Sequence, residues 1–289
     1  MWFSWIFLTY HVCRIVFAEG SSRSIRATLP PLLERTPQRE IKEMKVAPRL
    51  NDFMQPIGEP VTDWQGARLP GREPLVGRYC RIERVDVERH VEDLYQAYSE
   101  AADGRDWTYL AVGPFQSLDA YREHLTKAAA LTDPMHHAVI DLATGKAIGT
   151  LALMRIDTAN GVIEVGHVTY SPRLKRTRIA TEAMALLLKY VFEDLGYRRF
   201  EWKCDSLNGP SRAAALRYGF KFEGIFRQAI VYRGRSRDTA WFSIIDSEYP
   251  ALRTGFAQWL DERNFDAQGN QIERLADLIA RQQASGARG

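Results

Sequence analysis

Residues 162–220 contain the pattern that most limits how this chain can fold. An apolar, strand-like run over 162–170 ends at Ser171-Pro172, and a basic turn, Arg173-Leu-Lys-Arg-Thr-Arg178, leads into a helical run over 179–195. A second strand-like run follows at 198–204. This order predicts a βαβ crossover with parallel strands. The N–H groups and the dipole at the start of its helix favour an anion, so the basic turn indicates a phosphate site.

The rest of the chain predicts an α+β fold. Asp86 and Ser117 can each cap a helix, and the run over 179–195 is apolar round most of its circumference, so it should be buried against a sheet. Alternation and turn residues predict further strands over 77–85, 136–141, 147–156, 220–227, 229–233 and 239–245. We therefore expect a mixed, largely antiparallel sheet with one βαβ crossover, flanked by helices.

The chain divides into three expected segments. Residues 1–43 form an N-terminal extension, with an apolar part over 1–18 and a part over 19–43 whose composition is typical of a disordered linker. Either translation starts at Met44, or the extension is a signal or anchor, or it holds a folded element. The main domain spans 44–250. A helical tail over 251–289 carries one apolar stripe, which could pack on the domain or on a second subunit.

Composition excludes several classes of function. A net charge of only +3 over 289 residues predicts no general nucleic-acid surface. The three cysteines show no CxxC pair or metal-ligand spacing, so we expect no metal and a reducing, cytoplasmic environment. The apolar run over 1–18 is too short and too interrupted for a membrane span. A monomer or a homodimer is expected.

Taken in order, the motifs resemble those of the GNAT superfamily of N-acetyltransferases. Within it, the chain is most similar to the branch that acetylates N-terminal alanine or serine of ribosomal proteins. The resemblance covers about residues 70–246. It rests on Arg105-Asp-Trp-Thr-Tyr-Leu110, Glu164-x-Gly166-x-Val168 with Ser171-Pro172, Ala180-Thr-Glu-Ala183, Asn208-x-x-Ser211, Gly219-Phe220, Glu223-Gly224 and Arg237-Asp-Thr-Ala240.

This resemblance implies that residues 44–250 form a GNAT-like acetyltransferase domain. The co-substrate would be acetyl-CoA, and the acceptor a primary amine, above all a protein N-terminal α-amine. Two alternatives stay open: an enzyme that acetylates a small amine such as an antibiotic, and a non-catalytic acyl-CoA-binding protein.

The resemblance also implies a set of donor-binding residues. In the family, the backbone N–H groups of the turn hold the pyrophosphate. A family glycine is replaced here by Arg178, whose side chain should crowd the backbone but can bind phosphate in a bidentate way. Asn208 would bind the pantetheine arm or cap the next helix, and the N–H of Val168 would stabilise the oxyanion. The turn itself corresponds to Lys175, Arg176, Thr177, Arg178, Ile179 and Ala180.

Two residues are the expected catalytic groups. An N-terminal α-amine has a pKa near ~7.7–8.0, so a modest base suffices, and Glu164 is the candidate, directly or through water. The alternative is a strand carboxylate that faces outward. His167 should lie on the opposite face if the strand is regular. Many family members carry a tyrosine where this chain has Ala215, so Ser211 becomes the candidate proton donor to the thiolate, or else simply a first-turn residue.

The acceptor side is predicted from aromatic and acidic residues. Trp107, Tyr109 and Phe115 would line a pocket for a peptide end or a small amine, or would belong to the core. Asp205 would attract a cationic acceptor, or would be a solvated strand end.

Overall fold

The computed structural model describes residues 48–286, and the chain divides into two compact units between Pro60 and Val61. In the first unit, β1 (Arg49–Leu50) pairs antiparallel with β2 (Pro56–Ile57). The extension expected over 1–43 lies outside the described residues. Within residues 48–286, no helix combines the length and the apolar character needed to cross a membrane.

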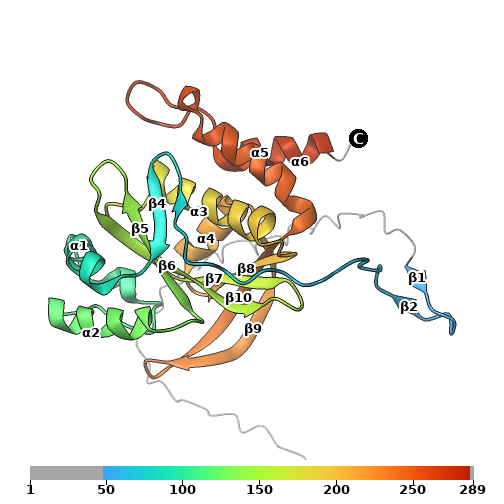
Figure 1. The fold of residues 1–289 in the computed structure, drawn as a ribbon, viewed down its shortest axis with the longest axis horizontal. Helices are drawn as coiled ribbons and strands as arrows, with labels where there is room; N and C mark the ends of the chain where they lie inside the picture. Colours follow the sequence, from blue (N-terminus) through green and yellow to red (C-terminus); the bar gives the residue numbers. More distant parts are fainter. Residues whose placement is uncertain (1–47, 287–289) are drawn as a thin grey trace, which may run out of the picture. The chain divides into compact units, whose positions relative to one another are not determined.

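Eight strands of the second unit form one sheet in the order β3-β4-β5-β6-β7-β8-β10-β9 (Figure 1). All neighbours are antiparallel except β7 and β8, which α3 (Arg178–Lys189) connects. This confirms the predicted α+β fold with its single crossover. The strands are β3 (Leu75–Val76), β4 (Cys80–Arg84), β5 (Met135–Asp141), β6 (Ala147–Asp157), β7 (Val162–Tyr170), β8 (Arg199–Asp205), β9 (Lys221–Tyr232) and β10 (Arg235–Ile245).

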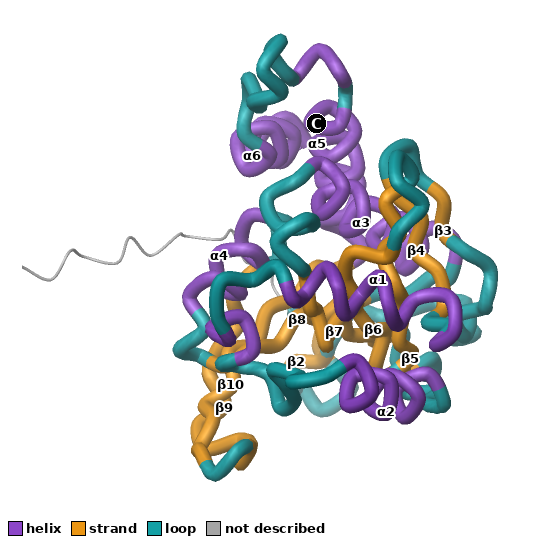
Figure 2. Tube along the Cα trace, turned by 90° about the vertical axis from the view of Figure 1, so that its left-hand side faces the viewer, coloured by secondary structure: helices purple, strands orange, loops and turns teal. Residues whose placement is uncertain are grey.

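Helices cover both faces of this sheet (Figure 2). On β5, Ala138 and Ile140 pack with α1 (Val87–Ser99) and α2 (Leu118–Ala129), whereas Val139 belongs to the core under α3. Because neighbouring strand residues point to opposite faces, α1 and α2 lie opposite α3.

The predicted ends of three helices are confirmed. Asp86 accepts a hydrogen bond from the N–H of Arg89, and Ser117 accepts one from that of Ala120. Beyond α3 the helix continues as a π-helical turn, η2 (Tyr190–Asp194), and it ends before Gly196, whose φ is +75°.

β7 and β8 separate after a short paired stretch. Their parallel register covers Val162–Val165 opposite Arg199–Trp202, and both strands continue beyond it. On its other side, β7 forms a bulge against β6 that leaves His167 and Val168 out of the register, and His167 has a φ of +47°. The prediction that His167 lies on the face opposite Glu164 required a regular strand. Because of the bulge, β7 is not regular at this position.

The C-terminal third differs in detail from the sequence prediction. The two strands expected over 220–227 and 229–233 are one strand, β9, which pairs with β10 across register shifts. The tail follows η3 (Asp246–Glu248) and consists of α5 (Tyr249–Leu260), η4 (Glu262–Asn264) and α6 (Leu275–Gly286).

The tail packs on the domain. Leu252 and Phe256 of α5 join the core under α3, and Gly255 lies so close to α6 that an added Cβ would stand 2.7 Å from Ile279 Cγ1. Leu275, Leu278 and Ile279 of the tail's apolar stripe are therefore buried within the same unit, whereas Ile272 is exposed. This decides between the two packings that the sequence left open.

Candidate active site

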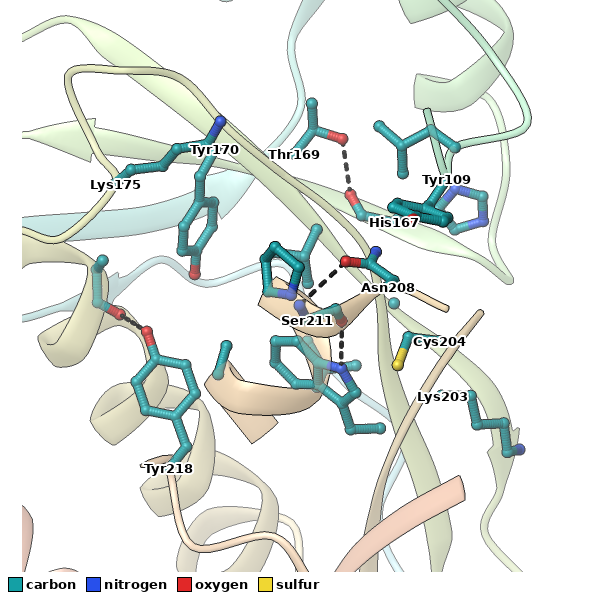
Figure 3. A pocket seen from close by; sticks show the side chains of 18 of the residues that line it. Tyr109, His167, Thr169, Tyr170, Lys175, Lys203, Cys204, Asn208, Ser211 and Tyr218 are labelled. Carbon is teal, nitrogen blue, oxygen red and sulfur yellow. Dashed lines mark hydrogen bonds between the residues drawn. The ribbon is translucent and has the colours of Figure 1, made fainter. Parts of the chain in front are cut away.

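A groove of about 1870 Å³ opens where β7 and β8 separate (Figure 3). Its walls come from β7 and the turn after it, α3, β8, α4 (Gly209–Arg217), the β9–β10 hairpin, and parts of the loops over 105–111 and 259–271. Most residues expected at the site lie on these walls: Tyr109, Glu164, Val168, Lys175, Arg176, Thr177, Arg178, Ala180, Asp205, Asn208 and Ser211.

Three expected residues are not on the walls. Trp107 is 6% exposed and packs edge-on against Tyr98 and Phe115, with ring centroids 5.4 Å and 5.5 Å away. Phe115 also contacts Tyr121, so both rings belong to the core beneath the loop and not to an acceptor pocket. The side chain of Ile179 packs against the main core, so only its backbone could meet a ligand.

The turn before α3 is built around Ser171. Its hydroxyl donates to the carbonyl of Ile148 at 2.5 Å, and its own carbonyl accepts from the N–H groups of Leu174 and Lys175. Thr177 then caps α3, since its Oγ1 accepts from the N–H of Ala180 at 3.2 Å. The N–H groups of the two residues before Ala180 have no partner inside the helix, so they remain available to an anion.

The cations of this turn fall into two classes. Lys175 pairs with Asp106 at 2.5 Å, which ties the turn to the 105–111 loop. Arg176 and Arg178 have no carboxylate partner within residues 48–286. The guanidinium carbon of Arg178 lies 3.6 Å from the ring centroid of Phe265. Arg178 does not adopt a positive φ, so its presence in place of the family glycine strains no backbone; Arg176 is the residue with a φ of +61°.

Glu164 lies in a buried network of charges. It is 3% exposed, and its Oε2 accepts from Arg155 Nη1 at 2.6 Å and from Lys203 Nζ at 2.9 Å. Lys203 also pairs with Glu201 at 2.7 Å and lies 3.7 Å from the ring centroid of Trp241. Within the described chain, the other oxygen, Oε1, makes no hydrogen bond. These contacts exclude the outward-facing carboxylate that the sequence left open.

His167 shares this end of the groove with Glu164. Its ring stands 5.0 Å from that of His136, centroid to centroid, and both it and Glu164 line the groove. Shielding from water lowers the pKa of His167 below its ordinary value, although the Glu164 carboxylate acts in the opposite direction. The imidazole is therefore neutral at physiological pH and can accept a proton. Sequence reasoning missed this position because only the bulge brings the ring to the groove.

Ser211 and Asn208 lie at the centre of the groove (Figure 3). Asn208 Oδ1 accepts from the N–H of Ser211 at 3.1 Å and caps α4, which leaves its NH₂ group as a donor. Ser211 Oγ accepts from Trp202 Nε1 at 3.0 Å and lies within hydrogen-bond reach of the Cys204 thiol. The Tyr218 hydroxyl instead donates to the carbonyl of Ala180 at 3.4 Å, and burial raises its pKa.

The wall predicted to meet the acceptor is lined by residues from three elements. Tyr109 donates to the carbonyl of Leu207 at 3.1 Å and stands on the wall. Asp205 is 4% exposed and accepts from Tyr232 at 2.8 Å, so it is not a solvated strand end. The remaining apolar wall comes from the hairpin, through Phe226, Ala229, Ile230 and Trp241, none of which the sequence marked.

Known proteins are similar to this chain in fold and in sequence. The GNAT resemblance implied a mixed sheet with one βαβ crossover and an anion site at the start of its helix. Residues 81–221 match the family described as Acetyltransferase (GNAT) domain. The crystal structure of a GCN5-related N-acetyltransferase from Brucella melitensis is 45% identical, with a TM-score of 0.75, over 76% of this chain and 100% of that one. The chain belongs to the GNAT acetyltransferase family and is an acyltransferase.

Two curated relatives are more distant. An uncharacterized N-acetyltransferase, p20, of Bacillus licheniformis is 28% identical over 61% of this chain and 96% of its own. YdaF of Bacillus subtilis (strain 168), named as a candidate ribosomal N-acetyltransferase, is 27% identical over 58% of this chain and 90% of its own. GNAT enzymes use acetyl-CoA as the acetyl donor and an amine as the acceptor.

Proposed function

We propose that this protein acetylates the N-terminal α-amine of a protein, of the alanine or serine type found on ribosomal proteins. The observation that carries the proposal is the separation of β7 and β8, which creates one groove with anion-binding groups at one end and a buried carboxylate at the other. The name of the relative YdaF supports the ribosomal acceptor.

The donor end suits a diphosphate. The first N–H groups of α3 are available there, and Arg176 and Arg178 have no carboxylate to neutralise them anywhere in residues 48–286. Asn208 keeps its NH₂ group for the amide-rich pantetheine arm. When bound, acetyl-CoA supplies an acetyl thioester, whose carbonyl can be attacked by a neutral amine.

The reaction end suits an α-amine better than a lysine. Oε2 of Glu164 already accepts from Arg155 and Lys203, so only Oε1 remains to meet an incoming amine. An α-amine, with a pKa of ~7.7–8.0, needs much less help than a lysine near ~10.4. Glu164 Oε1 therefore serves to orient the amine and to receive its proton through water.

The remaining roles follow from the local geometry. The bulge takes Val168 out of the β6 register, and the strand separation removes it from β8, so its N–H can donate to the developing oxyanion. The Ser211 hydroxyl, oriented by the Trp202 indole, donates a proton to the leaving thiolate.

Acceptor screening by thiol release tests the proposal. We expect turnover with peptides that begin with alanine or serine. The same peptides with a blocked N-terminus and an internal lysine should give no release, and mass spectrometry should place the acetyl group on the α-nitrogen. Equal or faster release with blocked peptides, or with small amines such as aminoglycosides, would overturn the proposed acceptor and favour the small-amine alternative.

A further inference from the structure

A segment of the chain that lies beyond the family match in sequence forms part of the groove. The GNAT domain match ends at residue 221, yet Trp259, Phe265, Gly269, Asn270 and Gln271 of the tail all line the groove wall. The apolar stripe of the tail predicted only a packing role. Its loop between α5 and α6 instead reaches the start of α3.

The loop has a fixed internal structure. Trp259 Nε1 donates to Gln271 Oε1 at 2.8 Å, and Phe265 forms an isolated antiparallel bridge with Gln271. Asn264 is 8% exposed, and its amide donates to the carbonyl of Trp259 at 3.2 Å while its Oδ1 accepts from the N–H of Glu273 at 2.8 Å. The groove side of the loop is therefore organised before any ligand binds, which lowers the entropic cost of binding.

Two arginines of the GNAT domain lie against aromatic rings of the tail, one at the end of α5 and one in the loop that follows it. Arg178 stands 3.6 Å from the centroid of Phe265, and Arg217 stands 5.1 Å from that of Trp259. Arg217 also donates to Thr181 Oγ1 at 3.2 Å. Neither arginine meets a carboxylate within the described part of the chain.

Two arginines of the tail itself, by contrast, are paired with carboxylates. Arg253 pairs with Glu193 and Arg263 pairs with Asp261. The ring-stacked arginines thus stand out as cations that the protein holds in place and leaves uncompensated at the groove. A cation–π contact holds a guanidinium near the ring without using all its N–H groups, so some can donate to phosphate oxygens.

We propose that Trp259, Phe265 and loop 269–271, together with Arg178 and Arg217, form a C-terminal clamp on the nucleotide end of the donor. The clamp would take the adenosine 3′,5′-diphosphate part of coenzyme A, with the arginines on its phosphates. This rests on the proposed function, since it assumes that the donor occupies the groove. Binding energy from this end, remote from the thioester, holds the donor in register for reaction.

Calorimetry with adenosine 3′,5′-bisphosphate and with coenzyme A tests the clamp without requiring turnover. Arg217→Gln removes one cation but keeps most of the stem, and Phe265→Leu removes the ring but keeps an apolar side chain. Each should weaken binding of both ligands about tenfold, as expected for the loss of one charge-assisted contact. Arg253→Gln, on the same tail but paired with Glu193, is the matched control and should bind like the wild type.

A third ligand separates the clamp from a general effect on folding. The kcat/KM for S-acetylpantetheine, which lacks the nucleotide, should be unchanged in both variants. An equal loss with this ligand, or full affinity of both variants for the bisphosphate, would overturn the clamp. Thermal unfolding checks that each variant folds, and Arg217→Gln leaves the ring packing of the loop intact.

The outcome for the clamp is distinguishable from that for the acceptor. A wild-type protein that binds coenzyme A but acetylates no α-amine removes the proposed acceptor and leaves the clamp standing. A wild-type protein that binds neither coenzyme A nor the bisphosphate removes both.

Discussion

The two ends of the groove differ in whether their charged side chains are paired. At the donor end, Arg176, Arg178 and Arg217 line the wall without any carboxylate partner in residues 48–286. At the reaction end, Glu164 and Lys203 are almost fully buried and bonded to each other. Uncompensated cations in contact with water cost little and gain much when a polyanion binds. Buried charges persist only when they are paired, so they are fixed in position and resistant to change.

The difference in charge gives the two ends of the groove different functions in the proposed mechanism. The donor end is built to bind, and its residues should act on KM and Kd. In the proposed mechanism the reaction end orients the amine, so its residues should act on kcat.

The largest effect is expected at Glu164. Glu164→Gln keeps the shape but removes the charge that receives the proton, so kcat should fall about 10²-fold. The residual rate should follow the neutral fraction of the amine and rise with pH up to ~7.7–8.0. Steady-state kinetics over a pH series with an Ala-starting peptide measure both.

Glu201→Gln is the matched control for Glu164. It removes the other carboxylate bonded to Lys203, but Glu201 does not line the groove. It should change kcat by less than about threefold. Equal losses in the two variants would mean that the network acts only as a structural unit.

The fold was largely predictable because its signals are local. The strand over 162–170, the caps Asp86 and Ser117, and the helix stop before Gly196 each depend on a few adjacent residues. The merged strand β9 was missed because a pairing partner, β10, holds a stretch whose own pattern breaks at residue 228.

The site was predictable only in its chain order. The turn over 175–180 and the Asn208 cap follow from sequence, but the partners of Glu164 come from β6 and β8 and depend on sheet register. The bulge that turns His167 toward the groove carries no local signal. Trp107 and Phe115 were misplaced because aromatic side chains look alike in a core and in a pocket wall.

In mild acid the fold should lose stability, and the cause should be its buried histidines and not the paired charges. Burial lowers the pKa of His136 to about 4 and that of His137 to about 3, from 6.5. Above pH 6.5 both residues are neutral in the folded and unfolded states. As the pH falls below 6.5, the unfolded state binds protons first, so each histidine costs about 2 kcal/mol of stability by about pH 5.

His137→Leu tests this source of acid instability. Between pH 7 and about 5, its free energy of unfolding in urea should fall by about 2 kcal/mol less than that of the wild type. Burial also lowers the pKa of His124, so His124→Leu should act in the same direction. An unchanged pH slope in His137→Leu would place the acid-labile groups elsewhere, with the charge network of the reaction end as the first suspect.

At the proposed donor end, loss of a cation should weaken binding of acetyl-CoA. Arg178→Gln removes a cation at the start of α3, so the KM for acetyl-CoA should rise about tenfold with little change in kcat. The increase should shrink at high salt, which screens the lost charge. Arg173→Gln is the matched control on the same turn, since Arg173 pairs with Glu100 and does not line the groove. A fall in kcat without a rise in KM would break the assignment of this end to binding.

The smallest effect is expected at Ser211, between the two ends. A thiolate leaves easily because a thiol has a pKa of only ~8.5, so losing a proton donor should lower kcat about threefold in Ser211→Ala. The same variant leaves Trp202 Nε1 without its acceptor, which should cost about 1 kcal/mol of stability. Ser211→Thr keeps a hydroxyl and should restore both kcat and the unfolding temperature. If Ser211→Ala loses stability but keeps the wild-type kcat, Ser211 only orients the indole, and Cys204, buried beside it, becomes the next side chain to test.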